Sequence, residues 1–218
     1  MKIAVIYGGQ GSQFVGMGKM LYETNAVFKT FIDQANSEVD FDLVSVMFNE
    51  EAIHQTKYAQ VAIFTMNAGL TQLLKEKGIK IEASAGLSLG EYNALLNSGV
   101  FNFQEGIKII SHRGKVMQAS SLKQTTKMLA LLGNLEAVTT CIEPYDDVYI
   151  ANYNALTQYV VGGSEASIMK VMDSAKDYGI KRAVLLETSG AFHTPYMMDA
   201  QTAFESFLAP LNLNEPKG

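Results

Sequence analysis

The chain has 218 residues, of which 48% are hydrophobic and 18% charged, as expected for a soluble globular protein with one large domain or a core and a smaller domain. Its net charge of −5 argues against a nucleic-acid-binding protein, which would carry a basic patch. No apolar run approaches the roughly 20 residues of a membrane span, and the single cysteine, Cys141, cannot form an internal disulfide.

The N-terminal segment is too short and too soon interrupted by glycine to be a signal peptide. Together with the lone cysteine, which lies in the apolar phase of a helical stretch, this predicts a cytoplasmic protein. Residues 2–7, KIAVIY, predict a buried strand that ends at Gly8 and Gly9. A glycine-rich loop then leads into helical sequence that continues to about residue 37.

A long helical pattern over residues 58–77 ends at Gly78, with basic residues in its last turn. A short strand follows over residues 81–87. Two more helices are predicted over residues 91–99 and from residue 103 to about residue 120.

Between residues 127 and 187 the predicted order is strand, helix, strand, strand, helix, strand, which is typical of a ferredoxin-like unit. We therefore predict a small ferredoxin-like subdomain over residues 125–188, inserted into an α/β core with a parallel sheet. That core comprises residues 1–124 and 189–218, and its last helix begins at Pro195, because proline favours the first helical position.

Ser88 lies between Gly86 and Gly90, after a predicted strand and before a predicted helix. This context indicates a nucleophile elbow, a tight turn that presents a serine above a sheet. There the N–H of Leu89 can stabilise an oxyanion, with help from the helix dipole. The alternative is a serine that only caps the helix.

The loop GGQGSQFVGMGK (8–19) resembles a phosphate-binding loop but lacks the required residues. Lys19 is followed by Met20 rather than Ser or Thr, and the third glycine of a dinucleotide fingerprint is replaced by Phe14. The loop nevertheless follows a strand, where open α/β sheets build their sites. The N–H of Gln10 is thus a candidate second oxyanion donor, unless this is an ordinary strand-to-helix loop.

Arg113 falls within the apolar arc of the helix that begins at Phe103. A buried arginine is costly unless it pairs with an anion, and its planar fork suits a carboxylate. Periodicity alone leaves two partners open, a substrate carboxylate or a buried acidic side chain.

Of the three histidines, His54 and His112 lie in polar phases of helical sequence and are expected to be solvated. His193 follows the last predicted strand, so it is the candidate general base that a nucleophilic serine needs. The alternative is a packing histidine beside Phe192.

The sequences GGQGSQ, GLSLGEY, RGKVMQ, NYNALTQYVVGG and SGAFHTPYM occur in this order along the chain. Together they resemble malonyl-CoA:acyl carrier protein transacylase. The resemblance implies an α/β-hydrolase-like core with a ferredoxin-like subdomain, and ping-pong transfer of a malonyl group from malonyl-CoA to the phosphopantetheine thiol of acyl carrier protein in fatty acid biosynthesis. It implies no cofactor and no metal, while the charge and the short apolar runs predict that neither nucleic acid nor membrane is a partner.

The resemblance also implies roles for individual residues. Ser88 would be the nucleophile and His193 the general base, with an oxyanion hole formed by the backbone N–H groups of Gln10 and Leu89. Arg113 would bind the malonyl carboxylate. Two further substrate-binding positions are implied, Gln60 near the site and Phe192, whose ring would favour malonyl over methylmalonyl.

Two departures from the family are visible. Leu87 stands where the family usually has histidine, and the chain ends where family members continue, so we expect that the C-terminal part of the family fold is missing. Two other functions stay open. One is an α/β serine hydrolase, which would need an acid between Ser88 and His193 in chain order, with these candidates: Asp146, Asp147, Asp173, Asp177 and Glu187. The other is a non-catalytic remnant that binds acyl carrier protein.

Overall fold

The computed structural model describes residues 2–217, which divide into two compact units. Unit 1 comprises residues 2–115 together with residues 206–217, and unit 2 is Val116–Glu205. Unit 2 contains the predicted 125–188 subdomain and also the end of one long helix and most of another. Each unit is described by itself below, and the predicted boundaries of the core and the subdomain stay a prediction.

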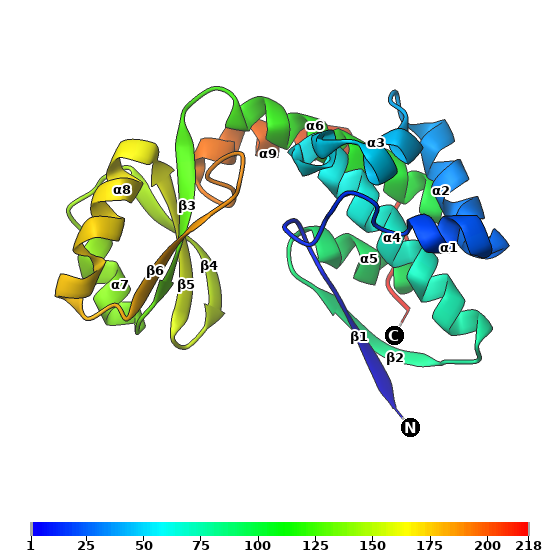
Figure 1. The fold of residues 1–218 in the computed structure, drawn as a ribbon, viewed down its shortest axis with the longest axis horizontal. Helices are drawn as coiled ribbons and strands as arrows, with labels where there is room; N and C mark the ends of the chain where they lie inside the picture. The colour runs from blue at the N-terminus through cyan, green and yellow to red at the C-terminus, as the bar shows by residue number, and fades with distance from the viewer. Residues whose placement is uncertain (1, 218) are drawn as a thin grey trace. The chain divides into compact units, whose positions relative to one another are not determined.

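Unit 1 is built on two parallel strands, β1 (Ile3–Tyr7) and β2 (Ile81–Gly86), with helices packed beside them (Figure 1). The helices in chain order are α1 (Lys19–Thr24), α2 (Ala26–Glu38), α3 (Leu43–Asn49), the short 3₁₀ helix Glu51–His54, α4 (Thr56–Glu76), α5 (Leu89–Asn97) and α6 (Phe103–Ser121). The predicted elements of this part of the chain are therefore present, and the predicted parallel pairing is confirmed.

Strand β1 is not buried as predicted. Its side chains alternate, with Tyr7 buried and the Ile6 side chain 83% exposed. Within the described residues β1 pairs only with β2, and helix α5 contacts both strands. An apolar run predicts a strand covered on both faces, but here one face remains exposed because burial depends on segments that periodicity does not reveal.

Helix α6 begins with a reciprocal capping interaction. The backbone N–H of Asn102 donates to the carboxylate of Glu105 at 2.8 Å, and the N–H of Glu105 donates to Asn102 Oδ1 at 2.9 Å. This capping box satisfies two of the N–H groups that every helix leaves without an internal acceptor. It fixes the start of the helix that carries Arg113.

Unit 2 contains the predicted ferredoxin-like order: β3 (Thr126–Leu132), α7 (Leu135–Ile142), β4 (Val148–Ala155), β5 (Gln158–Ser164), α8 (Glu165–Ser174) and β6 (Arg182–Leu186). A 3₁₀ turn, Ala175–Tyr178, follows α8. The four strands form an antiparallel sheet in the order β4-β5-β3-β6. Both helices lie on one face of this sheet (Figure 1), as the split β-α-β pattern requires.

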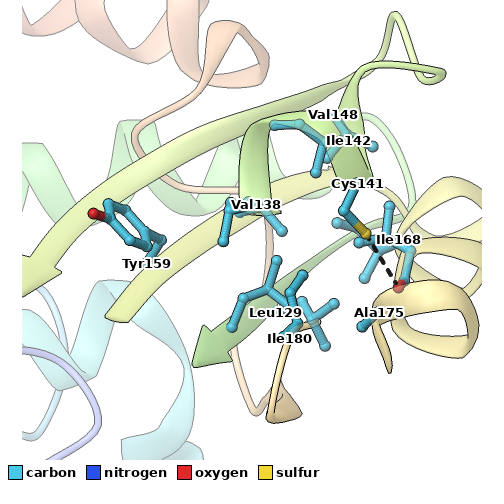
Figure 2. Close-up of a cluster of buried hydrophobic side chains, with 12 residues drawn as sticks. Leu129, Val138, Cys141, Ile142, Val148, Tyr159, Ile168, Ala175 and Ile180 are labelled. Carbon is cyan, nitrogen blue, oxygen red and sulfur yellow. Dashed lines mark hydrogen bonds between the residues drawn. The ribbon is translucent and has the colours of Figure 1, made fainter. Parts of the chain in front are cut away.

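Apolar side chains from the two helices and the sheet form the core of this unit (Figure 2). Cys141 is fully buried in it, and its thiol contacts the backbone oxygen of Val171 at 3.9 Å. Burial also raises the pKa of this thiol, so the cysteine is a packing residue, as its position in the helix predicts.

The chain then passes through a loop to a short 3₁₀ turn, Pro195–Met197, and helix α9 (Met198–Leu208). The predicted helix start at Pro195 is confirmed, although its first turn is 3₁₀ rather than α. Among residues 2–217 no helix is long and apolar enough to cross a bilayer.

Candidate active site

The elbow at Ser88 has the backbone that the sequence predicts. Ser88 has φ 53° and ψ −105°, a conformation that non-glycine residues rarely adopt. It lies between the end of β2 and the first turn of α5. Strain of this kind is retained only where the surrounding structure enforces it, and it is typical of catalytic residues.

The two flanking glycines are required by close backbone contacts. A Cβ atom at Gly86 would lie 2.0 Å from the carbonyl carbon of Gly90. A Cβ atom at Gly90 would lie 2.3 Å from the backbone oxygen of Tyr7 at the end of β1. Any side chain at either position would therefore push the helix away from the strands that support the elbow.

The two backbone N–H groups predicted to form the oxyanion hole, those of Leu89 and Gln10, both lie in unit 1. Leu89 is the first residue of α5, so its N–H precedes the first intrahelical hydrogen bond. Gln10 lies in a turn in which the Gly9 carbonyl accepts from both the N–H (3.3 Å) and the hydroxyl (2.8 Å) of Ser12. In a planar trans peptide the N–H points opposite to the carbonyl, so these bonds direct the Gln10 N–H away from Ser12.

Side chains hold the same loop in place. Gln10 Nε2 donates to the hydroxyl of Thr56 at 3.0 Å, and the N–H of Gly11 donates to Gln13 Oε1 at 2.8 Å. Gly11 has φ 104°, which glycine adopts without strain. A Cβ at Gly9 would lie 3.0 Å from the backbone oxygen of Leu87, so the loop passes directly beside the elbow.

Arg113 points to the elbow serine. Its Nη2 donates to Ser88 Oγ at 3.0 Å, and its Nη1 donates to Gln60 Oε1 at 2.8 Å. Arg113 is 8% exposed and Gln60 is fully buried. Three residues that the sequence analysis singled out separately are thus joined by one guanidinium group.

The partner of Arg113 is not a buried acid. None of the ion pairs formed by residues 2–217 includes Arg113. The Tyr92 ring lies 5.3 Å from the guanidinium carbon, and burial lowers the pKa of Arg113. Burial also raises the pKa of Tyr92, an effect that the nearby guanidinium opposes. The hydrogen-bond partners of Arg113 are neutral, and the acidic neighbour that affects its pKa, Glu91, is exposed. A buried cation without a buried anion is an incomplete ion pair, which is consistent with the prediction that a substrate carboxylate is its partner.

His193 and Phe192 lie in unit 2, in the loop before α9. His193 is exposed and has φ 60°. Among the described residues, Ser88 and His193 are the two non-glycine positions with positive φ. The Phe192 ring packs in a cluster with Met128, Val160 and Met197, and its role in substrate selection stays a prediction.

The other two histidines differ from each other. His54 is exposed and lies 3.4 Å from Glu51, as expected. His112 was predicted to be solvated, and this was wrong. Its ring stacks on Phe207, with centroids 4.1 Å apart, because the last residues of α9 belong to unit 1 and place this ring beside α6.

Comparison with known proteins identifies the family. Residues 5–218 match the family model for the acyl transferase domain. The chain belongs to this family. The acyl transferase domain described here is 34% identical to a protein from Bacillus subtilis named malonyl CoA-acyl carrier protein transacylase, with 98% of this chain and 70% of that protein aligned.

Solved structures agree with this assignment. A malonyl CoA-acyl carrier protein transacylase from Clostridium perfringens superimposes with a TM-score of 0.92 and 34% identity, over 100% of this acyl transferase domain and 71% of that chain. A malonyl-transacylase solved in complex with a type II PKS acyl-carrier protein has a TM-score of 0.92 and 28% identity, over 100% and 72% of the two chains. The predicted fold class is confirmed by these similarities.

Some residues of the site were missed by sequence reasoning. Thr56, which anchors Gln10, and Ser12, which fixes the turn, were not singled out as site residues. Ser12 is part of the GGQGSQ motif, so the motif offered a signal. Thr56 offered none, because a threonine at a helix start is explained equally well by local capping. Among residues 2–217 no group of three or more His, Cys, Asp or Glu is arranged to hold a metal ion.

Proposed function

We propose that this acyl transferase domain transfers a malonyl group from malonyl-CoA to the phosphopantetheine thiol of acyl carrier protein, through a malonyl ester on Ser88. The observation that carries the proposal is the double hydrogen bond of buried Arg113, to Ser88 and to Gln60. A carboxylate two bonds beyond the reacting carbonyl is the group that a guanidinium beside the nucleophile would select.

In the first half-reaction Ser88 Oγ attacks the thioester carbonyl and its proton passes to His193. The negative charge that develops on the carbonyl oxygen is stabilised by the N–H groups of Leu89 and Gln10, donors worth about 10²–10³ in rate each. The carbon–sulfur bond then breaks, and His193 returns the proton to the leaving thiolate of coenzyme A.

In the second half-reaction the phosphopantetheine thiol gives its proton to His193 and attacks the malonyl ester. Ser88 leaves and recovers the proton. Thioester exchange needs no redox change, so we propose that the reaction proceeds without metal or cofactor. We also propose that the protein works in the cytoplasm, where the single thiol of Cys141 would stay reduced.

Selectivity follows from the same arginine. An acetyl group would leave the buried guanidinium without a carboxylate partner, and sites built to pair with a polar group reject analogues that lack it. Leu87, whose side chain is 61% exposed beside the elbow, replaces the family histidine without removing any group that the two half-reactions use.

The test is the intact mass of the protein after brief mixing with malonyl-CoA, beside the variants Ser88→Ala and His193→Ala. We expect a malonyl-sized gain in the parent, no gain in Ser88→Ala, and slow gain in His193→Ala. Addition of acyl carrier protein should then remove the adduct. If the adduct is lost to water as fast without acyl carrier protein as with it, the protein is a hydrolase and not a transferase.

A further inference from the structure

Two asparagine side chains connect the loop that contains the proposed oxyanion donor Gln10 to helix α5, which begins directly after Ser88. Asn67 on α4 uses both hydrogens of Nδ2, one toward the Gly8 carbonyl at 3.2 Å and one toward Asn93 Oδ1 at 3.1 Å. Asn93 on α5 is 1% exposed, and its Nδ2 donates to the backbone oxygen of Phe64 at 3.0 Å. The function proposed above assigns no role to this pair.

The pair lies where the loop that carries the Gln10 N–H meets the start of α5, which carries the Leu89 N–H. Gly8 opens the loop that contains Gln10, and Asn93 lies one helical turn after Leu89. A Cβ at Gly90 would be 3.2 Å from the Gly8 oxygen, so this loop packs directly on the first turn of α5. The Gly8 carbonyl therefore links the position of one N–H donor to the position of the other.

We propose that Asn67 is a positioning residue for acyl transfer, which holds the Gly8 carbonyl and so keeps the N–H of Gln10 aligned with the N–H of Leu89. The inference rests on the proposed oxyanion hole and deepens it. Without the Asn67 side-chain amide, the loop keeps its hydrogen bonds through Thr56 and Ser12 but loses the hydrogen-bonded connection to Asn93 on α5. A donor displaced by about 1 Å can cost about 100-fold in rate.

Asn67 would act by positioning an oxyanion donor and not by contacting the substrate carboxylate. Its loss should therefore lower the rate of the chemical step without changing the affinity for malonyl-CoA. For Asn67→Leu, which keeps the branching and the number of side-chain heavy atoms but removes the amide, we expect the saturating rate of Ser88 acylation to fall about 10- to 100-fold. The half-saturating malonyl-CoA concentration should stay within about twofold of the parent's. Asn67→Gln, which retains an amide donor, should recover part of the rate.

Asn97→Leu is the matched control. Asn97 lies one turn after Asn93 on α5, and its amide makes one hydrogen bond, to Ser84 at 3.4 Å, away from the loop. We expect this variant to lower the melting temperature without changing the acylation rate. A general loss of stability in Asn67→Leu would then be distinguishable from a loss of alignment.

Single-turnover acylation is measured with malonyl-CoA and, separately, with p-nitrophenyl acetate. The ester lacks the carboxylate that Arg113 would bind, so it should react more slowly than malonyl-CoA, but its activated leaving group keeps the reaction measurable and dependent on the oxyanion donors. If malonyl-CoA fails and the ester reacts in an Asn67-dependent way, the proposed substrate is wrong and the positioning role stands. Equal ester rates in the parent and Asn67→Leu, a fall confined to malonyl-CoA half-saturation, or a folded parent that reacts with neither reagent would each overturn the positioning role.

Discussion

Arg113 donates a hydrogen bond to the Oγ atom of Ser88, so the buried cation of α6 contacts the proposed nucleophile directly. A cation that donates to the serine oxygen favours the charged form of that oxygen. When a substrate carboxylate arrives, the guanidinium can exchange its neutral partners, Ser88 and Gln60, for an anion. In the proposed reaction this contact would link substrate recognition to release of the serine for attack.

The two-point hydrogen-bonding geometry of the Arg113 guanidinium should matter more for acylation by malonyl-CoA than its charge does. Arg113→Lys keeps the charge but loses the two-point geometry, so acylation by malonyl-CoA should fall. Truncating one partner of a buried charged pair costs about 2–5 kcal/mol, and we therefore expect a loss of about 30-fold or more for Arg113→Ala. Competition between malonyl-CoA and acetyl-CoA, read by intact mass, measures the effect. An unchanged malonyl-to-acetyl ratio in Arg113→Ala would show that the arginine does not select the carboxylate.

The glycines of the elbow should be far less tolerant than a glycine in an open turn. In Gly90→Ala the new methyl group would meet the backbone oxygen of Tyr7 at 2.3 Å, so helix and strand must move apart. We expect a loss of about 1–3 kcal/mol or more in unfolding free energy. Urea denaturation measures it, with loss of Ser88 acylation as a second readout.

Gly78→Ala is the control for backbone strain. Gly78 has φ 75° but no atom within 4 Å of its Cβ position, so only the left-handed conformation is penalised, by about 1–2 kcal/mol. Acylation should survive in this variant. Full acylation in Gly90→Ala would contradict the packing argument for the elbow.

The sequence was most informative where local rules and long-range packing agree. The order of elements in unit 2 predicted a ferredoxin-like unit, because a split β-α-β pattern leaves few alternatives, and the observed sheet order β4-β5-β3-β6 agrees with it. The elbow was predictable for a similar reason, since Gly86, Ser88 and Gly90 follow a predicted strand and precede a predicted helix, the context in which this spacing indicates a nucleophile elbow. The burial of Arg113 followed from helical periodicity, but its contacts with Ser88 and Gln60 required the structure.

Features that depend on distant segments could not be predicted. The exposed face of β1 and the stacking of His112 on Phe207 are decided by what packs there, and a single sequence does not contain that information. The Asn67–Asn93 contact joins two helices through residues that are 26 positions apart in sequence. Asparagines in helical patterns ordinarily predict exposed positions, so neither half-buried Asn67 nor buried Asn93 gave a signal.

The capping box of α6 should contribute to stability without contributing to catalysis. Asn102→Ala removes an N-cap side chain, which typically costs about 1 kcal/mol. Arg113 lies about three turns further along the helix, so the acylation rate should stay unchanged. Glu105→Gln keeps the reciprocal cap and is the control. A large loss of acylation in Asn102→Ala, at a temperature where the variant is folded, would show that the helix start positions the arginine.

Asp147 should make the stability of the protein depend on pH in the acidic range. Hydrogen bonds from Ser164, the N-cap of α8, and from Ser167 hold the pKa of this carboxyl below its usual value, against an opposing effect of burial. Because the folded pKa is depressed, the stabilisation is fully present above the unfolded pKa of about 3.9 and is lost as the pH falls through the folded value.

Asp147→Asn removes that titration and leaves the other carboxylates unchanged. Urea midpoints of the parent and the variant, measured from pH 6 to pH 3, should therefore differ most at pH 6 and converge below pH 4. The variant keeps a side-chain oxygen that can accept from the serines, so the fold is retained and the difference reports the charge. A gap that widens toward low pH would mean that the carboxylate is destabilising in the folded state, contrary to the direction of its pKa.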